Sequence, residues 1–237
     1  MIELLEYNES LPNNSYLEYC FNAMKDLSDS IDWICFHEKD MDEDDIQVYE
    51  RNYIISLTAK LAERKYESNQ KVSIPGLING EVIKSLSACS QNAKDEYVKI
   101  KRMKNKEYSA GSYYVFPDFL IHESHSEDNN TWTPENQHII IEAKTRQIND
   151  AYSFFMDFFK LNFYIHELHF KNAIYMIVRT PISQIEEYLK QYVEEVDYLH
   201  DEDLDKLLFF IQETLDSKPK IYKINTIDVY ETICNYP

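Results

Sequence analysis

The sequence predicts an α/β protein with a mixed central β-sheet flanked by helices, and with helical additions at both ends of the chain. Two observations support this prediction. Short apolar runs, such as Ile-Ile-Ile at residues 139–141, alternate with longer segments of helical periodicity. The isoleucine run is apolar on both faces of a strand, which requires a layer of helices on each side of the sheet.

Length and composition restrict the class of protein further. The chain has 237 residues, 44% of them hydrophobic, which is enough to bury one full core. It has no leader-like start and no apolar run near the roughly 18 residues of a membrane span, so we expect a cytoplasmic protein. Its four cysteines form no Cys-x-x-Cys pair, which favours free thiols over disulfides or zinc. Three glycines leave no glycine-rich phosphate loop.

Periodicity predicts the elements in order along the chain. In the first half we expect helices at residues 15–24 and 46–66, a strand at 71–74, a mixed insertion up to 110, and strands at 113–123 and 138–146. In the second half we expect a helix at 149–168, a strand at 173–178, helices at 183–198 and 201–215, and a β-like stretch at 220–233. The predicted division is an acidic helical extension (1–45), an α/β core (46–180) and acidic C-terminal helices with a terminal strand packed on the core (181–237).

Two short motifs are the strongest indication of chemistry. Pro117-Asp118 lies on one apolar stretch, and Glu142-Ala143-Lys144 ends another. Alternate side chains of a strand share a face, so Glu142 and Lys144 point the same way. Charged groups at the end of a buried isoleucine run are costly to desolvate and need a partner or a purpose. With Asp118 alongside, two carboxylates suit a hard divalent cation, and the lysine suits a developing negative charge.

Pro-Asp, a spacer and Glu-x-Lys on an apolar strand resemble the active-site signature of the PD-(D/E)xK nuclease superfamily, which includes restriction endonucleases. The predicted order of elements over residues 46–180 is also similar to the core of that superfamily. The resemblance implies that Asp118 and Glu142, helped by the Ala143 carbonyl, bind Mg²⁺ or Mn²⁺. It implies that Lys144 orients the attacking water or stabilises the pentavalent phosphorus.

Other charged residues have two interpretations. Many members of the superfamily carry a glutamate on the first core helix that reaches the metal through water, and Glu50 fits that place. Alternatively, Glu50 serves the positive end of its helix. Asp157 and Lys160 are three residues apart on an apolar helix. They form either a buried ion pair or a support for the residues of the site. His122 and His125 would face opposite sides of a strand, which disfavours zinc.

The charge distribution bears on the partner. The net charge is −18, which opposes binding of a polyanion. Residues 1–50 carry a net −12 and residues 181–237 a net −8, so the segment 51–180 that holds the motifs is at +2. A basic run, made of Lys99, Lys101, Arg102, Lys104 and Lys106, precedes Pro117 and is either a solvated face or a contact with a nucleic-acid backbone.

The sequence therefore predicts a metal-dependent nuclease that cleaves nucleic acid, with DNA favoured over RNA, and the resemblance to the superfamily implies a role in prokaryotic restriction or defence. The acidic ends would keep the chain off bulk DNA or bind a protein partner, and an oligomer is compatible with this prediction. The alternative is a non-catalytic protein on the same fold that acts as an acidic protein-binding module or a DNA mimic.

Overall fold

The computed structural model describes residues 4–7, 16–28, 50–67, 77–80, 84–85, 89–109, 114–122 and 134–224. Its strands are β1 (Leu4–Glu6), β2 (Leu77–Gly80), β3 (Lys84–Ser85), β4 (Tyr114–Val115), β5 (Phe119–His122), β6 (Gln137–Lys144), β7 (Asn172–Val178), β8 (Leu207–Gln212) and β9 (Lys220–Ile224). Its α-helices are α1 (Tyr16–Ser28), α2 (Glu50–Glu67), α3 (Gln91–Lys104), α4 (Ala151–His166) and α5 (Ile182–Glu195). Short 3₁₀ helices occur at η3 (Pro134–Asn136) and η4 (Asp201–Lys206).

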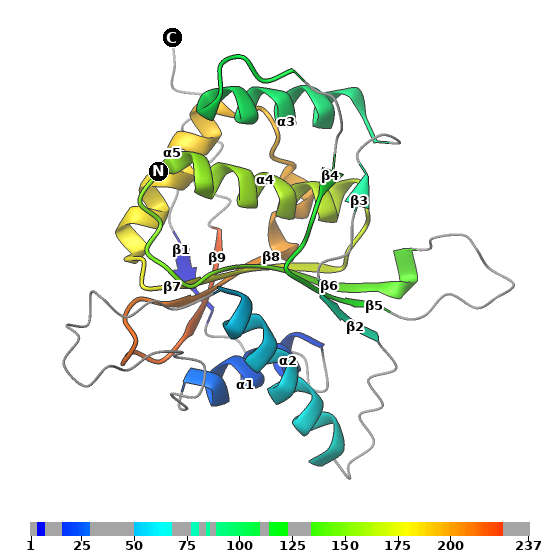
Figure 1. Ribbon diagram of the computed structural model, residues 1–237, viewed down its shortest axis with the longest axis vertical. Helices are drawn as coiled ribbons and strands as arrows, with labels where there is room; N and C mark the ends of the chain where they lie inside the picture. Colours follow the sequence, from blue (N-terminus) through cyan, green and yellow to red (C-terminus); the bar gives the residue numbers. More distant parts are fainter. Residues whose placement is uncertain are drawn as a thin grey trace, which may run out of the picture.

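The described residues form an α/β structure around an open, mixed seven-stranded sheet with the order β1-β9-β8-β7-β6-β5-β2. The central pairs β6–β7 and β7–β8 are parallel, and the outer pairs are antiparallel. Helices α1 and α2 cover one face, and α3, α4 and α5 cover the other (Figure 1). The two-stranded sheet β3–β4 lies on the same side as α3 and α4. The layer of helices expected on each side of the sheet is therefore present.

Strand β6 shows how the sequence produces these layers. Ile139, Ile141 and Ala143 are buried in the core beneath α1 and α2. Ile140 points to the opposite face and joins the larger core that contains α4. Because both faces are covered by helices, the strand is an almost continuous apolar run instead of an alternating one. Glu142 shares the face of Ile140, so the sheet itself directs this carboxylate toward α4.

Helix α4 lies between the sheet and two other helices. Its N-cap is Asp150, whose carboxylate accepts a hydrogen bond from the backbone amide of Ser153 at 2.8 Å. Its side chains are buried almost all round, including Phe154, Phe158 and Phe159. A helix that is apolar all round belongs in the interior of a protein. The charged residues Asp157 and Lys160 on this helix are therefore held in a largely apolar layer.

Most of the predicted elements are confirmed, with two corrections. The run Leu207–Gln212 is strand β8 and not part of a helix over 201–215, because it is central in the sheet and buried along its length. The strand predicted at 113–123 is two strands, β4 and β5, separated at Pro117, which has no backbone N–H for a sheet. The strand predicted at 71–74, the acidic stretch 38–45 and residues 225–233 lie outside the described residues.

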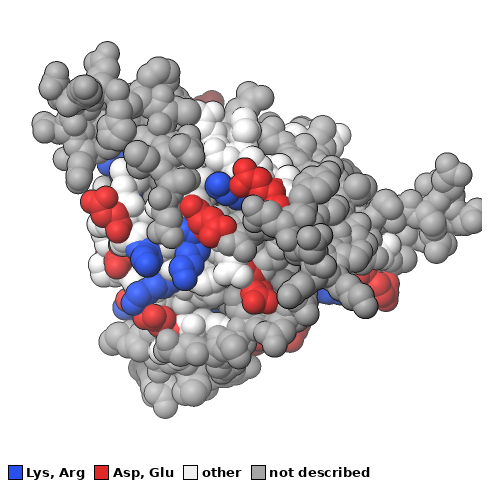
Figure 2. All heavy atoms as spheres, turned by 90° about the horizontal axis from the view of Figure 1, so that it is seen from below, with Lys and Arg blue, Asp and Glu red and all other residues white. Residues whose placement is uncertain are grey.

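Within the described part of the chain, no helix combines the length and the apolar character that crossing a membrane requires. The face that carries α1 and α2 is seen from below in Figure 2, where basic and acidic side chains lie next to each other among the described residues.

Candidate metal and phosphate site

Asp118 lies at the bend between β4 and β5. Its Oδ2 accepts a hydrogen bond from the backbone amide of Ala143 at 2.8 Å, which ties the bend to β6. The antiparallel register pairs Phe119 with Ile141, and one further step places Asp118 opposite Glu142. Side chains directly opposite each other in such a pair lie on the same face. The sequence motifs Pro-Asp and Glu-Ala-Lys therefore meet in space as predicted.

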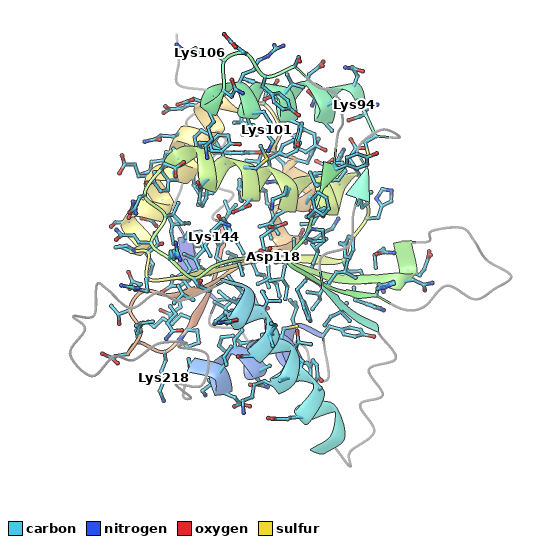
Figure 3. The ribbon with its side chains drawn as sticks, viewed as in Figure 1. Lys94, Lys101, Lys106, Asp118, Lys144 and Lys218 are labelled. Atoms are coloured by element: carbon cyan, nitrogen blue, oxygen red, sulfur yellow. The ribbon has the colours of Figure 1, made fainter. Side chains whose placement is uncertain are left out.

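Glu142 and Lys144 both point toward α4 from the carboxyl-terminal end of β6. Glu142 is fully buried, at 0% exposure, whereas the side chain of Lys144 is 25% exposed. Asp118 is half-buried beside them (Figure 3). The three predicted site residues thus share one face, and two of them are accessible to solvent.

Helix α4 completes the group with two charged side chains. Lys160 Nζ lies 2.5 Å from Glu142 Oε2 and 2.8 Å from Asp157 Oδ1. Lys144 Nζ lies 3.0 Å from Asp157 Oδ2. The ion pair predicted between Asp157 and Lys160 is confirmed, and it also contacts both charged residues of the Glu-x-Lys motif. We call Asp118, Glu142, Lys144, Asp157 and Lys160 the charged centre.

The carboxylates of the charged centre differ in their electrostatics. Burial raises the pKa of Glu142 well above its usual value, the nearby Asp118 charge adds to this, and Lys160 opposes it. Burial also raises the pKa of Asp118, against the opposing effects of Lys160 and the Ala143 amide. Burial acts on Asp157 in the same direction, but Lys160 and Lys144 outweigh it and lower its pKa. A further cation would therefore stabilise Glu142 and Asp118 in particular.

One oxygen of the charged centre has no partner. Glu142 Oε1 is buried and makes no hydrogen bond with any described residue. The buried hydroxyl of Tyr164 is a neighbour of this carboxylate and interacts with it, although the two groups do not reach full hydrogen-bond geometry. Burial and then the charge of Glu142 raise the pKa of Tyr164. A buried carboxylate oxygen without a partner is costly, so it is the position at which a bound cation would contribute most.

The donor set fits a hard divalent cation. In an antiparallel ladder a residue directs its N–H and C=O toward the same neighbouring strand. Because the Ala143 amide points to Asp118, its carbonyl faces the same edge, next to the start of β5. Asp118, Glu142 and Ala143 thus offer only oxygen ligands, as Mg²⁺ and Mn²⁺ prefer.

Glu50 begins α2, and its side chain lies outside the described residues. Helix α2 packs on the sheet through Tyr53, Leu57 and Leu61, on the face opposite Glu142. The role predicted for Glu50 remains a prediction. His122 ends β5, and His125 also lies outside the described residues.

Two lysines of the basic run lie near the charged centre. Lys101 Nζ lies 5.4 Å from the ring centroid of Tyr97, and Lys104 Nζ lies 5.0 Å from that of Tyr152. The pKa of Lys101 is lowered by burial and then by Lys160 and Lys104. Figure 3 shows Lys101 on the side of α3 that faces α4, between Lys94 and Lys106. Lys99 instead pairs with Glu96 at 3.2 Å.

A second group, which the sequence did not predict, lies at the C-terminal end of α4. His166, His200 and Glu202 place ligand atoms within 4.8 Å of one another, beside a cavity of about 420 Å³. The two imidazole rings stack with centroids 3.3 Å apart and planes 1° from parallel. A ring nitrogen binds a metal in its own ring plane, and parallel planes share no point. This arrangement cannot hold one ion through both rings. His166 is distant in sequence from His200 and Glu202, so no local pattern indicated the group.

Comparison of the chain with models of protein families, with curated protein sequences and with solved structures finds no match.

Proposed function

We propose that the protein is a metal-dependent phosphodiesterase that hydrolyses nucleic acid, on a core similar to that of the PD-(D/E)xK nucleases. The proposal is supported by one observation: Asp118, Glu142 and Lys144 lie together on one face of the sheet, and one buried carboxylate oxygen has no hydrogen-bond partner in the described part of the chain. A bound Mg²⁺ or Mn²⁺ would polarise the scissile phosphate and lower the pKa of a bound water.

The residues of the chain have distinct roles in this proposal. Asp118, Glu142 and the Ala143 carbonyl would hold the cation. Lys144 would place its ammonium near the negative charge that develops on the phosphate, and its 25% exposed side chain leaves room for this contact. Asp157 would position Lys144, because their ion pair of 3.0 Å fixes the ammonium on the site face of β6.

Lys160 neutralises Glu142 in the described arrangement and would share that carboxylate with the cation. A divalent cation between Glu142 and Asp118 supplies two positive charges to carboxylates whose pKa values are raised. The positive charges of Lys101 and Lys104, on the neighbouring helix, would attract the phosphate backbone toward the site.

The test is cleavage of plasmid and single-stranded DNA with Mg²⁺ or Mn²⁺, compared with EDTA. We expect wild-type cleavage to need the metal and Asp118→Ala to abolish it, with weaker Mg²⁺ binding by calorimetry, because the cation loses one of few protein oxygens. Asp205→Ala, at an exposed acid of η4, is the matched control and should cleave normally. Cleavage in EDTA, or wild-type activity of Asp118→Ala, would contradict the proposal.

A second candidate is a non-catalytic protein that binds partners through its acidic surface. It is favoured by the exposed acids on and after α5, which are Glu187, Glu194, Glu195, Asp197, Asp201, Glu202 and Asp205. Under this alternative the charged centre is a structural ion-pair network that attaches α4 to the sheet. This alternative would be favoured if neither the wild type nor Asp118→Ala cleaved DNA in the presence of Mg²⁺ or Mn²⁺, and if both gave the same result in EDTA.

A further inference from the structure

We propose that the substrate is single-stranded nucleic acid, held by a strip of side chains next to the charged centre. The strip consists of Lys101 and Lys104 on α3, Tyr114 on β4, and Phe116 just after β4. This inference rests on the proposed function, because it names the substrate class of the same site.

The aromatic side chains of the strip are exposed. Tyr114 is 48% exposed and Phe116 is 45% exposed, whereas Val115 between them and Pro117 after them are buried. This alternation places both rings on the solvent side of the segment. Phe116 precedes Asp118 by two residues, so their Cα atoms lie within about 7 Å. A large apolar ring beside a candidate metal ligand offers a flat surface for a nucleobase.

The basic side chains of α3 are linked to the backbone of β4 through Tyr97. The Tyr97 hydroxyl donates a hydrogen bond to the Tyr114 carbonyl at 3.4 Å, which joins α3 to β4. Lys101 lies over the ring of the same Tyr97. Lys104 follows Lys101 by three residues on the same helix face, over Tyr152 of α4. The strip therefore runs from exposed aromatic rings to lysines near the charged centre.

The chemistry of the strip fits a single strand better than a duplex. Base faces are available for stacking in a single strand and are hidden inside the stack of a duplex. Double-stranded DNA also carries one charge per about 1.7 Å of its axis, against about 3.4 Å for one strand. A chain with a net charge of −18 repels the more densely charged polymer more strongly.

The experiment measures binding to the full chain in EDTA, where a metal-dependent cleavage cannot interfere. The probes are a fluorescein-labelled DNA oligonucleotide and its duplex, followed by anisotropy. We expect the single strand to bind at least about tenfold more tightly than the duplex. Phe116→Ala and Tyr114→Ala should each weaken single-strand binding by about 5- to 150-fold, the range for losing one stacked base. Phe116→Tyr, which keeps an aromatic ring, should bind the single strand as tightly as the wild type does.

The matched control is Ile55→Ala. Ile55 is an apolar residue of 58% exposure on α2, which covers the opposite face of the sheet, so its loss should leave binding unchanged. Lys101→Ala should weaken binding to both probes and make binding less dependent on salt, because one phosphate contact is removed. A melting curve for each variant separates lost contacts from lost folding.

Several outcomes would overturn the inference: equal or tighter duplex binding, no measurable binding, or a folded Phe116→Ala that binds as Ile55→Ala does. The two proposals fail separately. Metal-dependent cleavage of duplex without single-strand preference removes only this inference. Tight single-strand binding through the strip without any metal-dependent cleavage removes the proposed function and leaves the strip as a binding site, with the single strand a ligand and not a substrate.

Discussion

Two charged groups adjoin helix α4, one at the middle of the helix and one at its C-terminal end, and they look alike in sequence and differ in structure. Asp157–Lys160 and Asp203–Lys206 are both i,i+3 ion pairs, with distances of 2.8 and 2.5 Å. The first pair lies in the charged centre, and the second adjoins the group of His166 and His200. Lys160 and His166 are about 9 Å apart along the helix axis, from the rise of 1.5 Å per residue.

The surroundings make the difference between the two groups. The Lys160 side chain is 14% exposed and holds two carboxylates, whereas that of Lys206 is 40% exposed and holds one. At the charged centre, burial leaves Glu142 Oε1 without a hydrogen-bond partner among the described residues and leaves two carboxylates with raised pKa values. In the second group, Lys206 and His166 lower the pKa of Asp203 despite its burial. Of these two groups, only the charged centre has carboxylates that an added cation would stabilise, which argues for placing the metal there.

The largest expected effect compares the two lysines. Lys160→Met should lower the free energy of unfolding by about 3–5 kcal/mol, because it leaves buried carboxylates without their cation. Lys206→Met should cost at most about 1 kcal/mol, because water can replace an exposed partner. Urea denaturation of both variants at neutral pH provides the measurement. Equal losses would show that the two groups do not differ in the way argued above.

The next effect concerns activity at the charged centre. Lys144→Ala should reduce the cleavage rate by about 10²–10³, the usual cost of losing one preorganised charge at the transition state. Mg²⁺ affinity should stay nearly unchanged or rise, because removing an ammonium beside the cation relieves repulsion. Folding should survive, since the Lys144 side chain is 25% exposed and Asp157 keeps Lys160 as a partner.

Single-turnover cleavage and Mg²⁺ calorimetry of Lys144→Ala test these expectations separately. Lys206→Met, which removes a lysine of η4 outside the charged centre, is the control. If Lys144→Ala unfolds, or cleaves as fast as the wild type, the lysine belongs to a structural ion pair and not to the chemistry.

The sequence predicted the charged centre better than it predicted its surroundings. Period-two alternation placed Glu142 and Lys144 on one face, and the Pro-Asp pattern placed Asp118 beside them. The contacts of Lys160 with Glu142 and of Asp157 with Lys144 arise from the packing of α4 on β6, and no local pattern encodes that packing. The same limit hid the stacking of His166 on His200.

The errors in the fold have the same kind of cause. Leu207–Gln212 is buried on both faces in the middle of the sheet, so it lacks the alternation that identifies a strand, and its apolar run is equally compatible with a helix. Elements with clear periodicity or strong caps, such as α4 after Asp150, were predicted nearly to their ends.

The smallest effect tests the sign of the electrostatics with pH. The folded-state pKa of Glu142 is raised above its ordinary value of 4.5, so its ionisation opposes folding. The wild type should therefore lose stability relative to Glu142→Gln as pH rises from 4.5 toward the folded-state pKa, by at most about 1.4 kcal/mol per pH unit.

Asp203 has a lowered pKa, so it is ionised in both the folded and the unfolded chain above its ordinary value of 3.8. Asp203→Asn should thus run parallel to the wild type from pH 4.5 to neutrality. Urea midpoints across this range measure both slopes. A flat difference for Glu142→Gln would mean that Lys160 alone fully compensates the buried carboxylate, and the demand for a second cation would disappear with it.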